Sequence, residues 1–132
     1  MKEIWSKIIE FNNKYFPGWR ESREPIFFSN ALAGEVGEIC NAVKHLYGGG
    51  TNRKEVNEEL VALESVDALI YLVLLLDSLG FDYERFSRIF DFKMCVLRRR
   101  MERAPITFRD TPRGTARRIP IQFSKEEVRE EE

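Results

Sequence analysis

The stretch ESVDALIYLVLLL, residues 64–76, is the most apolar segment of the chain, and it begins with an acidic pair. Glu64 and Asp67 are three residues apart, so on a helix their carboxylates lie on the same face, one turn apart. Acidic side chains are rarely buried without a partner, because removing a charge from water costs several kcal/mol. The segment therefore predicts a helix buried on more than one side, with a site for a positive charge beside its acidic pair.

A second acidic pair with the same spacing lies earlier, in ALAGEVGEI, residues 31–39. Glu35 and Glu38 also face the same way on a helix. Neither pair contains a Lys or Arg, and the chain has a single His. A hard divalent cation held by carboxylate oxygens would balance the two pairs, and Mg²⁺ is the usual one. The alternative is a solvated charged face. Gly34 and Gly37, beside these acids, predict either close helix packing or close approach of a ligand.

The composition is that of a globular protein, with 43% hydrophobic and 33% charged residues in a chain of 132. The net charge of −1 gives no general attraction to nucleic acids or acidic membranes, so we expect neither as a partner. Cys40 and Cys95 lack metal-ligand spacing and are interpreted as reduced core thiols. The charged residues near the start do not fit a signal peptide. We therefore expect a cytoplasmic protein.

Helical spacing of apolar residues predicts an all-α fold with four main helices. The expected ranges are 2–16, 26–47, 51–79 and 83–103, with a polar connection over residues 19–24. Residues that start or stop helices mark these ends: Pro17-Gly18, Pro25, the glycines at 48–50, Thr51 or Asn52, Gly80, Asp82 and Pro105.

The chain divides by composition into a helical domain, residues 1–104, and a tail, residues 105–132. The tail is rich in Arg, Thr and Pro and lacks a helical apolar stripe, so we expect it to be irregular or docked on a partner subunit. Four helices cover a segment as apolar as residues 68–76 poorly. A second copy of the chain would cover it better, so we expect a homodimer or homotetramer.

The order of the two acidic stretches, ALAGEVGEI (31–39) and then ESVDALIYL (64–72), resembles the MazG-like all-α nucleoside triphosphate pyrophosphohydrolases. Their signature is a Glu cluster on one helix and a Glu-x-x-Asp cluster on the next. The resemblance covers about residues 11–100, and LGFD (79–82) closes the matching segment. It implies a four-helix MazG-like bundle that oligomerises, binds Mg²⁺ and hydrolyses an NTP or dNTP to the monophosphate and pyrophosphate.

The resemblance also implies roles for individual residues. The side chains of Glu35, Glu38, Glu64 and Asp67 would hold Mg²⁺, for which Mn²⁺ is expected to substitute. Glu38 is our candidate for the catalytic base that orients or deprotonates the attacking water. The candidates for substrate binding are Trp19, His45 and Tyr71 at the nucleoside and Lys93 and Arg100 at the phosphates.

Other interpretations remain open at this point. The aromatic candidates are equally consistent with core packing, and Arg98–Arg100 with a solvated helix end favoured by the helix dipole. Phosphoribosyl-ATP pyrophosphohydrolases share the same fold and are an alternative within the enzyme class. A non-catalytic helical module is the alternative outside it, sensing nucleotides or binding a partner through the basic residues 109–118.

Overall fold

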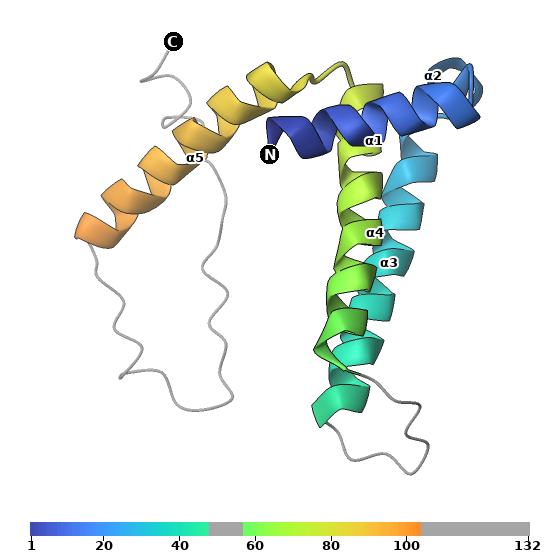
Figure 1. The fold of residues 1–132 in the computed structure, drawn as a ribbon. Coiled ribbons are helices and arrows are strands. Elements are labelled where there is room, and N and C mark those ends of the chain that lie inside the picture. Colours follow the sequence, from blue (N-terminus) through green and yellow to red (C-terminus); the bar gives the residue numbers. More distant parts are fainter. Residues whose placement is uncertain (48–56, 104–132) are drawn as a thin grey trace. The chain divides into compact units, whose positions relative to one another are not determined.

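The computed structural model describes residues 1–47 and 57–103, and every regular element within them is an α-helix (Figure 1). The all-α expectation is thus confirmed for this part of the chain. None of the described helices is long and apolar enough to cross a membrane. The helices are α1 (Lys2–Tyr15), α2 (Trp19–Ser22), α3 (Pro25–Tyr47), α4 (Glu58–Ser78) and α5 (Tyr83–Arg103).

The contacts divide the chain into a first unit, Met1–Arg85, and a second unit, Phe86–Glu132. Each unit is described by itself. The boundary expected from composition, at residues 104 and 105, coincides with the end of the described residues. The proposed tail and its separate role therefore remain predictions.

Several helix ends lie where turn and cap residues predicted them. Pro25 is the first residue of α3. Gly80 follows α4 with a positive φ of 83°, and its N–H donates to the carbonyl of Asp77. Asp82 precedes α5, and its Oδ1 accepts a hydrogen bond from the backbone N–H of Arg85 at 2.8 Å. These ends are fixed by local chemistry, which is why the sequence reveals them.

The start of α4 differs from the expectation. The structure begins this helix at Glu58, with Asn57 as its N-cap, and Asn57 Oδ1 accepts a hydrogen bond from the N–H of Leu60 at 3.0 Å. The caps expected at Thr51 or Asn52 lie outside the described residues. Asn57 satisfies one of the free N–H groups in the first turn, as an N-cap residue does.

The connection expected over residues 19–24 contains the short helix α2, which the sequence analysis missed. Gly18 adopts a left-handed conformation with φ of 75°, which glycine reaches without the steric cost of a Cβ. This turn reverses the chain after α1 and brings Trp19 into the core, where the side chain is 3% exposed. The free energy gained by burying the Trp19 side chain is enough to hold α2 against the core, although the other three residues of this helix are polar.

Helices α3 and α4 form an antiparallel pair, and α1 lies across the end of the pair where α4 finishes (Figure 1). Trp19, Phe28 and Leu74, from α2, α3 and α4, make the centre of the core. Trp19 and Phe28 pack edge to face, with ring centroids 5.5 Å apart. The remaining residues around this centre are Ile8, Ile9, Ile70, Tyr71 and Leu75. The core is therefore concentrated at the end of the helix pair that α1 crosses.

Helix α4 is only partly covered by the part of the chain that the structure describes. Val73 and Leu74 are buried, whereas Leu63 is 63% exposed and Val66 is also exposed. Within the described residues, the expectation that this helix is buried on more than one side is not met. Cys40 is likewise exposed on α3, so its interpretation as a core thiol is wrong. The sequence shows where apolar residues line one side of a helix, but it does not show which of them are covered by other residues of the same chain.

Candidate functional site

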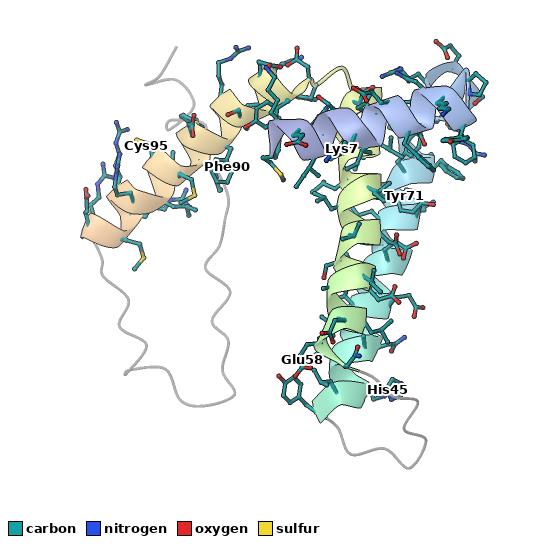
Figure 2. The ribbon with its side chains drawn as sticks, viewed as in Figure 1. Lys7, His45, Glu58, Tyr71, Phe90 and Cys95 are labelled. Carbon is teal, nitrogen blue, oxygen red and sulfur yellow. The ribbon has the colours of Figure 1, made fainter. Side chains whose placement is uncertain are left out.

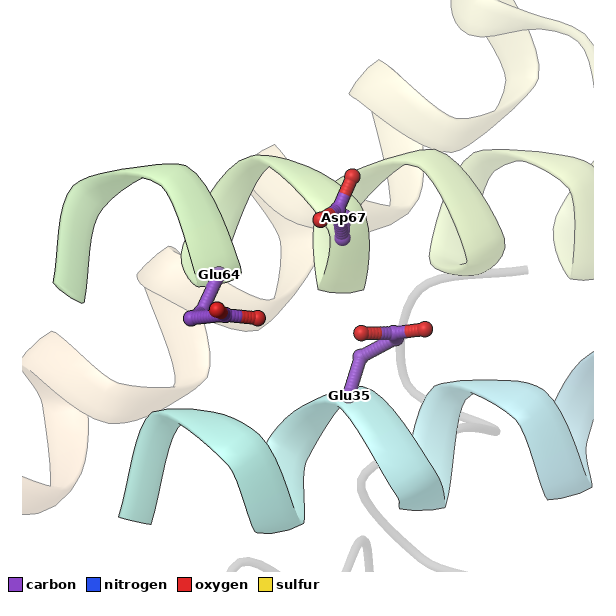
Figure 3. Close-up of side chains that lie close together, drawn as sticks. All are labelled: Glu35, Glu64 and Asp67. Atoms are coloured by element: carbon purple, nitrogen blue, oxygen red, sulfur yellow. The ribbon is translucent and has the colours of Figure 1, made fainter. Parts of the chain in front are cut away.

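Three carboxylates converge between the two long helices of the first unit. Glu35 projects from α3 toward α4, and Glu64 projects from α4 toward α3, with Asp67 one turn further along α4 (Figure 3). One oxygen from each side chain lies within 4.8 Å of the others. The arrangement follows from antiparallel packing, which places the middle of α3 beside the first half of α4.

This spacing is close to that of the ligands of a small divalent cation. Two oxygens on opposite sides of an octahedral Mg²⁺, each at 2.0–2.1 Å, are about 4.2 Å apart. A small side-chain movement would therefore bring the oxygens of Glu35, Glu64 and Asp67 to coordination distance. Magnesium commonly takes a few carboxylates from the protein and completes its shell with water and phosphate oxygens. The donor set fits Mg²⁺, and Mn²⁺ accepts the same oxygen ligands.

The negative charge of this acidic cluster is not balanced by nearby basic residues. Within the part of the chain that the structure describes, none of the three carboxylates forms an ion pair with Lys or Arg. Glu35 and Glu64 are half-buried, and Asp67 is exposed. Like charges this close repel one another, so a bound cation would lower the free energy of the folded state.

Glu38, the fourth expected ligand, is not part of the group of three. It is exposed on α3, one turn beyond Glu35. Its role as a metal ligand therefore stays a prediction.

A cavity of about 490 Å³ opens beside the acidic cluster, and Asp67 belongs to both. Its volume lies within the range typical of small-molecule sites, about 300–1,000 Å³. The wall is formed by α1, the segment through α2, and the facing sides of α3 and α4. The aromatic side chains in the wall are Phe11, Phe16, Trp19, Phe27, Phe28 and Tyr71.

The polar residues of the cavity wall are few. Lys7 and Arg23 supply two cations, and Asp67 supplies the carboxylate shared with the acidic cluster. The guanidinium carbon of Arg23 lies 4.0 Å from the centroid of the Phe27 ring, so this cation is held against an aromatic face. Asn12 adds an amide, and Trp19 and Tyr71 carry the other uncharged polar groups of the wall. An aromatic interior with charged groups around it suits a flat molecule that carries an anionic substituent.

Two of the expected substrate contacts, Trp19 and Tyr71, do line this cavity. Trp19 is also a core residue, and its Nε1 donates to Oδ1 of Asn13 at 2.9 Å. Tyr71 lies one turn beyond Asp67 on α4, which is about 6 Å at 1.5 Å per residue. The packing and binding interpretations therefore both apply to these two residues.

His45 lies on the other side of the acidic cluster from Tyr71. Figure 2 shows His45 and Glu58 at one end of the helix pair and Tyr71 near α1 at the other. Because α3 and α4 run in opposite directions, moving toward the C-terminus from each acidic pair leads to opposite ends. His45 is ten residues beyond Glu35, or about 15 Å along the helix. The expectation that one base contacts both His45 and Tyr71 is wrong for this chain.

Lys93 and Arg100, the expected phosphate contacts, are half-buried on α5 and belong to the second unit. The site described here is built from the first unit alone. Their contact with phosphate therefore stays a prediction.

The sequence analysis missed most of the cavity wall, including Lys7, Asn12 and Arg23. One signal was available: residues 11–28 contain six aromatic residues, against 12% aromatic residues in the whole chain. Such a density around a helix–turn–helix connection indicates an aromatic pocket or core. Periodicity alone cannot separate these outcomes, because both place aromatic rings on one face.

The two glycines beside the acidic residues do not serve close helix packing within the described residues. A Cβ built at Gly34 or Gly37 would meet no atom within 4 Å. The space beside both glycines is open within the described residues. Close approach of a ligand is therefore the explanation that remains for them.

Comparison of the chain with protein-family models, with curated proteins and with solved structures finds no match. The resemblance to the MazG-like hydrolases thus rests on the residues of the two acidic stretches. The acidic cluster and the cavity are the structural features that bear on function.

Proposed function

We propose that this protein is a Mg²⁺-dependent nucleotide pyrophosphohydrolase that converts an NTP or dNTP to the monophosphate and pyrophosphate, as the resemblance to MazG-like enzymes implies. The observation that carries the proposal is the position of Asp67. This carboxylate belongs both to the acidic cluster and to the wall of an aromatic cavity. A nucleotide has the matching form, with a flat base at one end and a metal-binding polyphosphate at the other.

In this proposal Glu35, Glu64 and Asp67 hold the cation. When bound, Mg²⁺ supplies a positive charge that neutralises the phosphates and favours attack on phosphorus. Lys7 and Arg23 add positive charge at the cavity, where they attract the anionic substrate. The aromatic rings hold the base and keep it at a fixed distance from the acidic cluster.

Glu38 is left out of the group of three, and this favours its proposed role as catalytic base. A carboxylate that is not used as a ligand can accept a proton from the attacking water. The water oxygen then bonds to the α-phosphorus, the bond between that phosphorus and the bridging oxygen breaks, and pyrophosphate leaves with the electron pair. Substitution of Glu38 by Gln should abolish turnover and leave the Mg²⁺ affinity almost unchanged.

The test is a screen of the eight common NTPs and dNTPs and of phosphoribosyl-ATP for pyrophosphate release, with and without Mg²⁺. We expect release that requires Mg²⁺ and that is lost in Asp67→Asn. Glu21→Gln, an exposed substitution on α2, is the control and should keep activity. If nucleotides bind but no pyrophosphate is released under any condition, the protein is a nucleotide-sensing module and the enzyme proposal is wrong.

We also propose that two or four copies of the chain assemble into the complete MazG-like bundle. The exposed apolar residues on the long helices support this, among them Ile26 on α3 and Leu63 and Val66 on α4. Burial of such residues between copies is favourable by about 25 cal/mol per Å². Light scattering coupled to size-exclusion chromatography should give a mass of two or four chains, and a monomer at micromolar concentration would contradict the proposal.

A further inference from the structure

The wall of the aromatic cavity contains one amide, on a residue that is buried as a whole, with no hydrogen-bond partner in the described part of the chain. Asn12, on α1, is 9% exposed and lines the cavity. Its side chain makes no hydrogen bond to any residue within 1–47 or 57–103. Polar side chains of buried residues almost always have a hydrogen-bond partner, because removing them from water without one is unfavourable.

The adjacent residue shows what a structural asparagine does in the same helix. Asn13 Oδ1 accepts hydrogen bonds from Trp19 Nε1 at 2.9 Å and from Arg20 Nη1 at 3.0 Å. Asn13 therefore holds α2 against α1. Asn12 has no such task, although it is the more deeply buried of the two.

We propose that the carboxamide of Asn12 hydrogen-bonds the Watson–Crick edge of a nucleobase bound in this cavity, and so selects the substrate. The inference rests on the proposed function for the class of ligand. It adds a specificity residue that the acidic stretches do not indicate.

The chemistry of the amide fits this role. A carboxamide presents one donor group and one acceptor side by side. The Watson–Crick edge of a base likewise presents an adjacent donor and acceptor, which proteins read by hydrogen bonds while aromatic side chains stack on the faces. The rings of Phe11, Phe16, Phe27 and Tyr71 line the same cavity and can supply that stacking. Stacking alone accepts every base, and Lys7 and Arg23 can only donate, so the amide is the group in the wall whose donor and acceptor together match a base edge.

The test uses binding of hydrolysis-resistant nucleotides to the full chain, so that it does not depend on turnover. The probes are the α,β-methylene triphosphates of the four bases, in the presence of Mg²⁺, measured by calorimetry. The best-binding nucleotide is then compared with its analogue carrying a methyl group on the Watson–Crick ring nitrogen. In the wild-type protein we expect the methyl group to raise Kd by roughly tenfold or more, because the edge is blocked and the amide is left unpaired.

Asn12→Leu provides the second arm of the experiment. This variant should bind the parent and the methylated nucleotide with equal affinity, since it has no amide to lose. It should also unfold at an equal or higher temperature than the wild type, because the amide makes no hydrogen bond to the described residues and is replaced by an apolar side chain of similar size. Asn30→Leu, an exposed substitution on α3, is the matched control and should keep the full discrimination.

Three results would overturn the inference: equal binding of the methylated analogue by the wild type, full discrimination in Asn12→Leu, or a marked loss of stability in Asn12→Leu. The two proposals fail separately. If the protein binds the parent nucleotide more tightly than the methylated one but releases no pyrophosphate, the proposed hydrolysis is wrong and the inference about Asn12 stands. Pyrophosphate release with no effect of the methyl group keeps the hydrolysis and removes the inference.

Discussion

Arg20 and Asp77 form an ion pair that joins the short helix α2 to the last turn of α4, with Arg20 Nε donating to Asp77 Oδ1 at 2.6 Å. The guanidinium of Arg20 also lies over the ring of Trp19, 4.3 Å from its centroid. The side chain of Asp77 is 16% exposed and that of Arg20 is 40% exposed, so the carboxylate is shielded from water while the guanidinium stays partly solvated. This contact holds α2, and with it one wall of the cavity, in place.

Loss of this pair should therefore destabilise the protein and disturb the cavity. We expect Arg20→Met to lower the free energy of unfolding by about 1.5–3 kcal/mol, the range for hydrogen bonds to charged groups. Urea unfolding measures the loss, and tryptophan fluorescence reports on the environment of Trp19. Glu3→Gln breaks the exposed Glu3–Lys7 pair and is the control, with little change expected. Equal losses of unfolding free energy in the two variants would show that the Arg20–Asp77 pair stabilises the protein no more than an exposed ion pair does.

The acidic cluster should make the protein less stable without a cation and more stable with one. Glu64→Gln removes a repelling charge, so the metal-free variant should melt slightly above the wild type. Millimolar Mg²⁺ should raise the melting temperature of the wild type, since a ligand at a hundred times its Kd contributes about 2.7 kcal/mol. The variant should lose most of that gain, whereas Glu38→Gln should keep it. A wild-type melting temperature that does not respond to Mg²⁺ or Mn²⁺ would count against the metal site.

Substitution of Gly37 by Ala should stabilise the isolated chain. Helical glycine is less favourable than alanine by about 0.8–1.0 kcal/mol, and a Cβ at this position meets no described atom within 4 Å. Thermal unfolding measures the gain. Gly80→Ala is the opposite case, because φ at Gly80 is 83° and an L-residue there costs about 1–2 kcal/mol. A loss of stability in Gly37→Ala would mean that the open space beside the acidic cluster is filled in solution.

The ion pair between Lys2 and Glu84 should be visible in a titration. The hydrogen bond from Lys2 and its charge hold the pKa of Glu84 below the ordinary value of 4.5, and the same hydrogen bond raises the pKa of Lys2 above 10.5. Because the folded pKa of Glu84 is the lower one, its stabilising effect is complete above pH 4.5 and is lost as the pH falls through the folded pKa. The effect of Lys2 is complete below pH 10.5 and is lost as the pH rises through its folded pKa.

Carbon-13 NMR of the Glu84 carboxyl measures this directly. Lys2→Met should move the Glu84 midpoint up toward 4.5, and Lys44→Met, on α3, should leave it unchanged. Both side chains of the pair are largely exposed, so the effect on total stability should be small. A Glu84 midpoint unaffected by Lys2→Met would mean that the pair does not persist in solution.

The sequence by itself determined the helical class and several of the helix ends. Pro25, Gly80 and Asp82 act through bonds and dihedral angles within one or two turns, so their effect does not depend on the rest of the fold. The three-residue spacing of Glu64 and Asp67 likewise fixed that they share a face of α4.

The tertiary structure decided which of these local features meet. Antiparallel packing of α3 and α4 brought Glu35 to Glu64 and Asp67, and it sent His45 and Tyr71 to opposite sides of them. The turn at Gly18 brought α1 across the helix pair and formed the cavity that Asn12 lines. Periodicity gives the face of each helix but not its direction, its rotation or its neighbour. Those are set by how bulky side chains such as Trp19 and Phe28 fill the space between helices, which depends on contacts far apart in the chain.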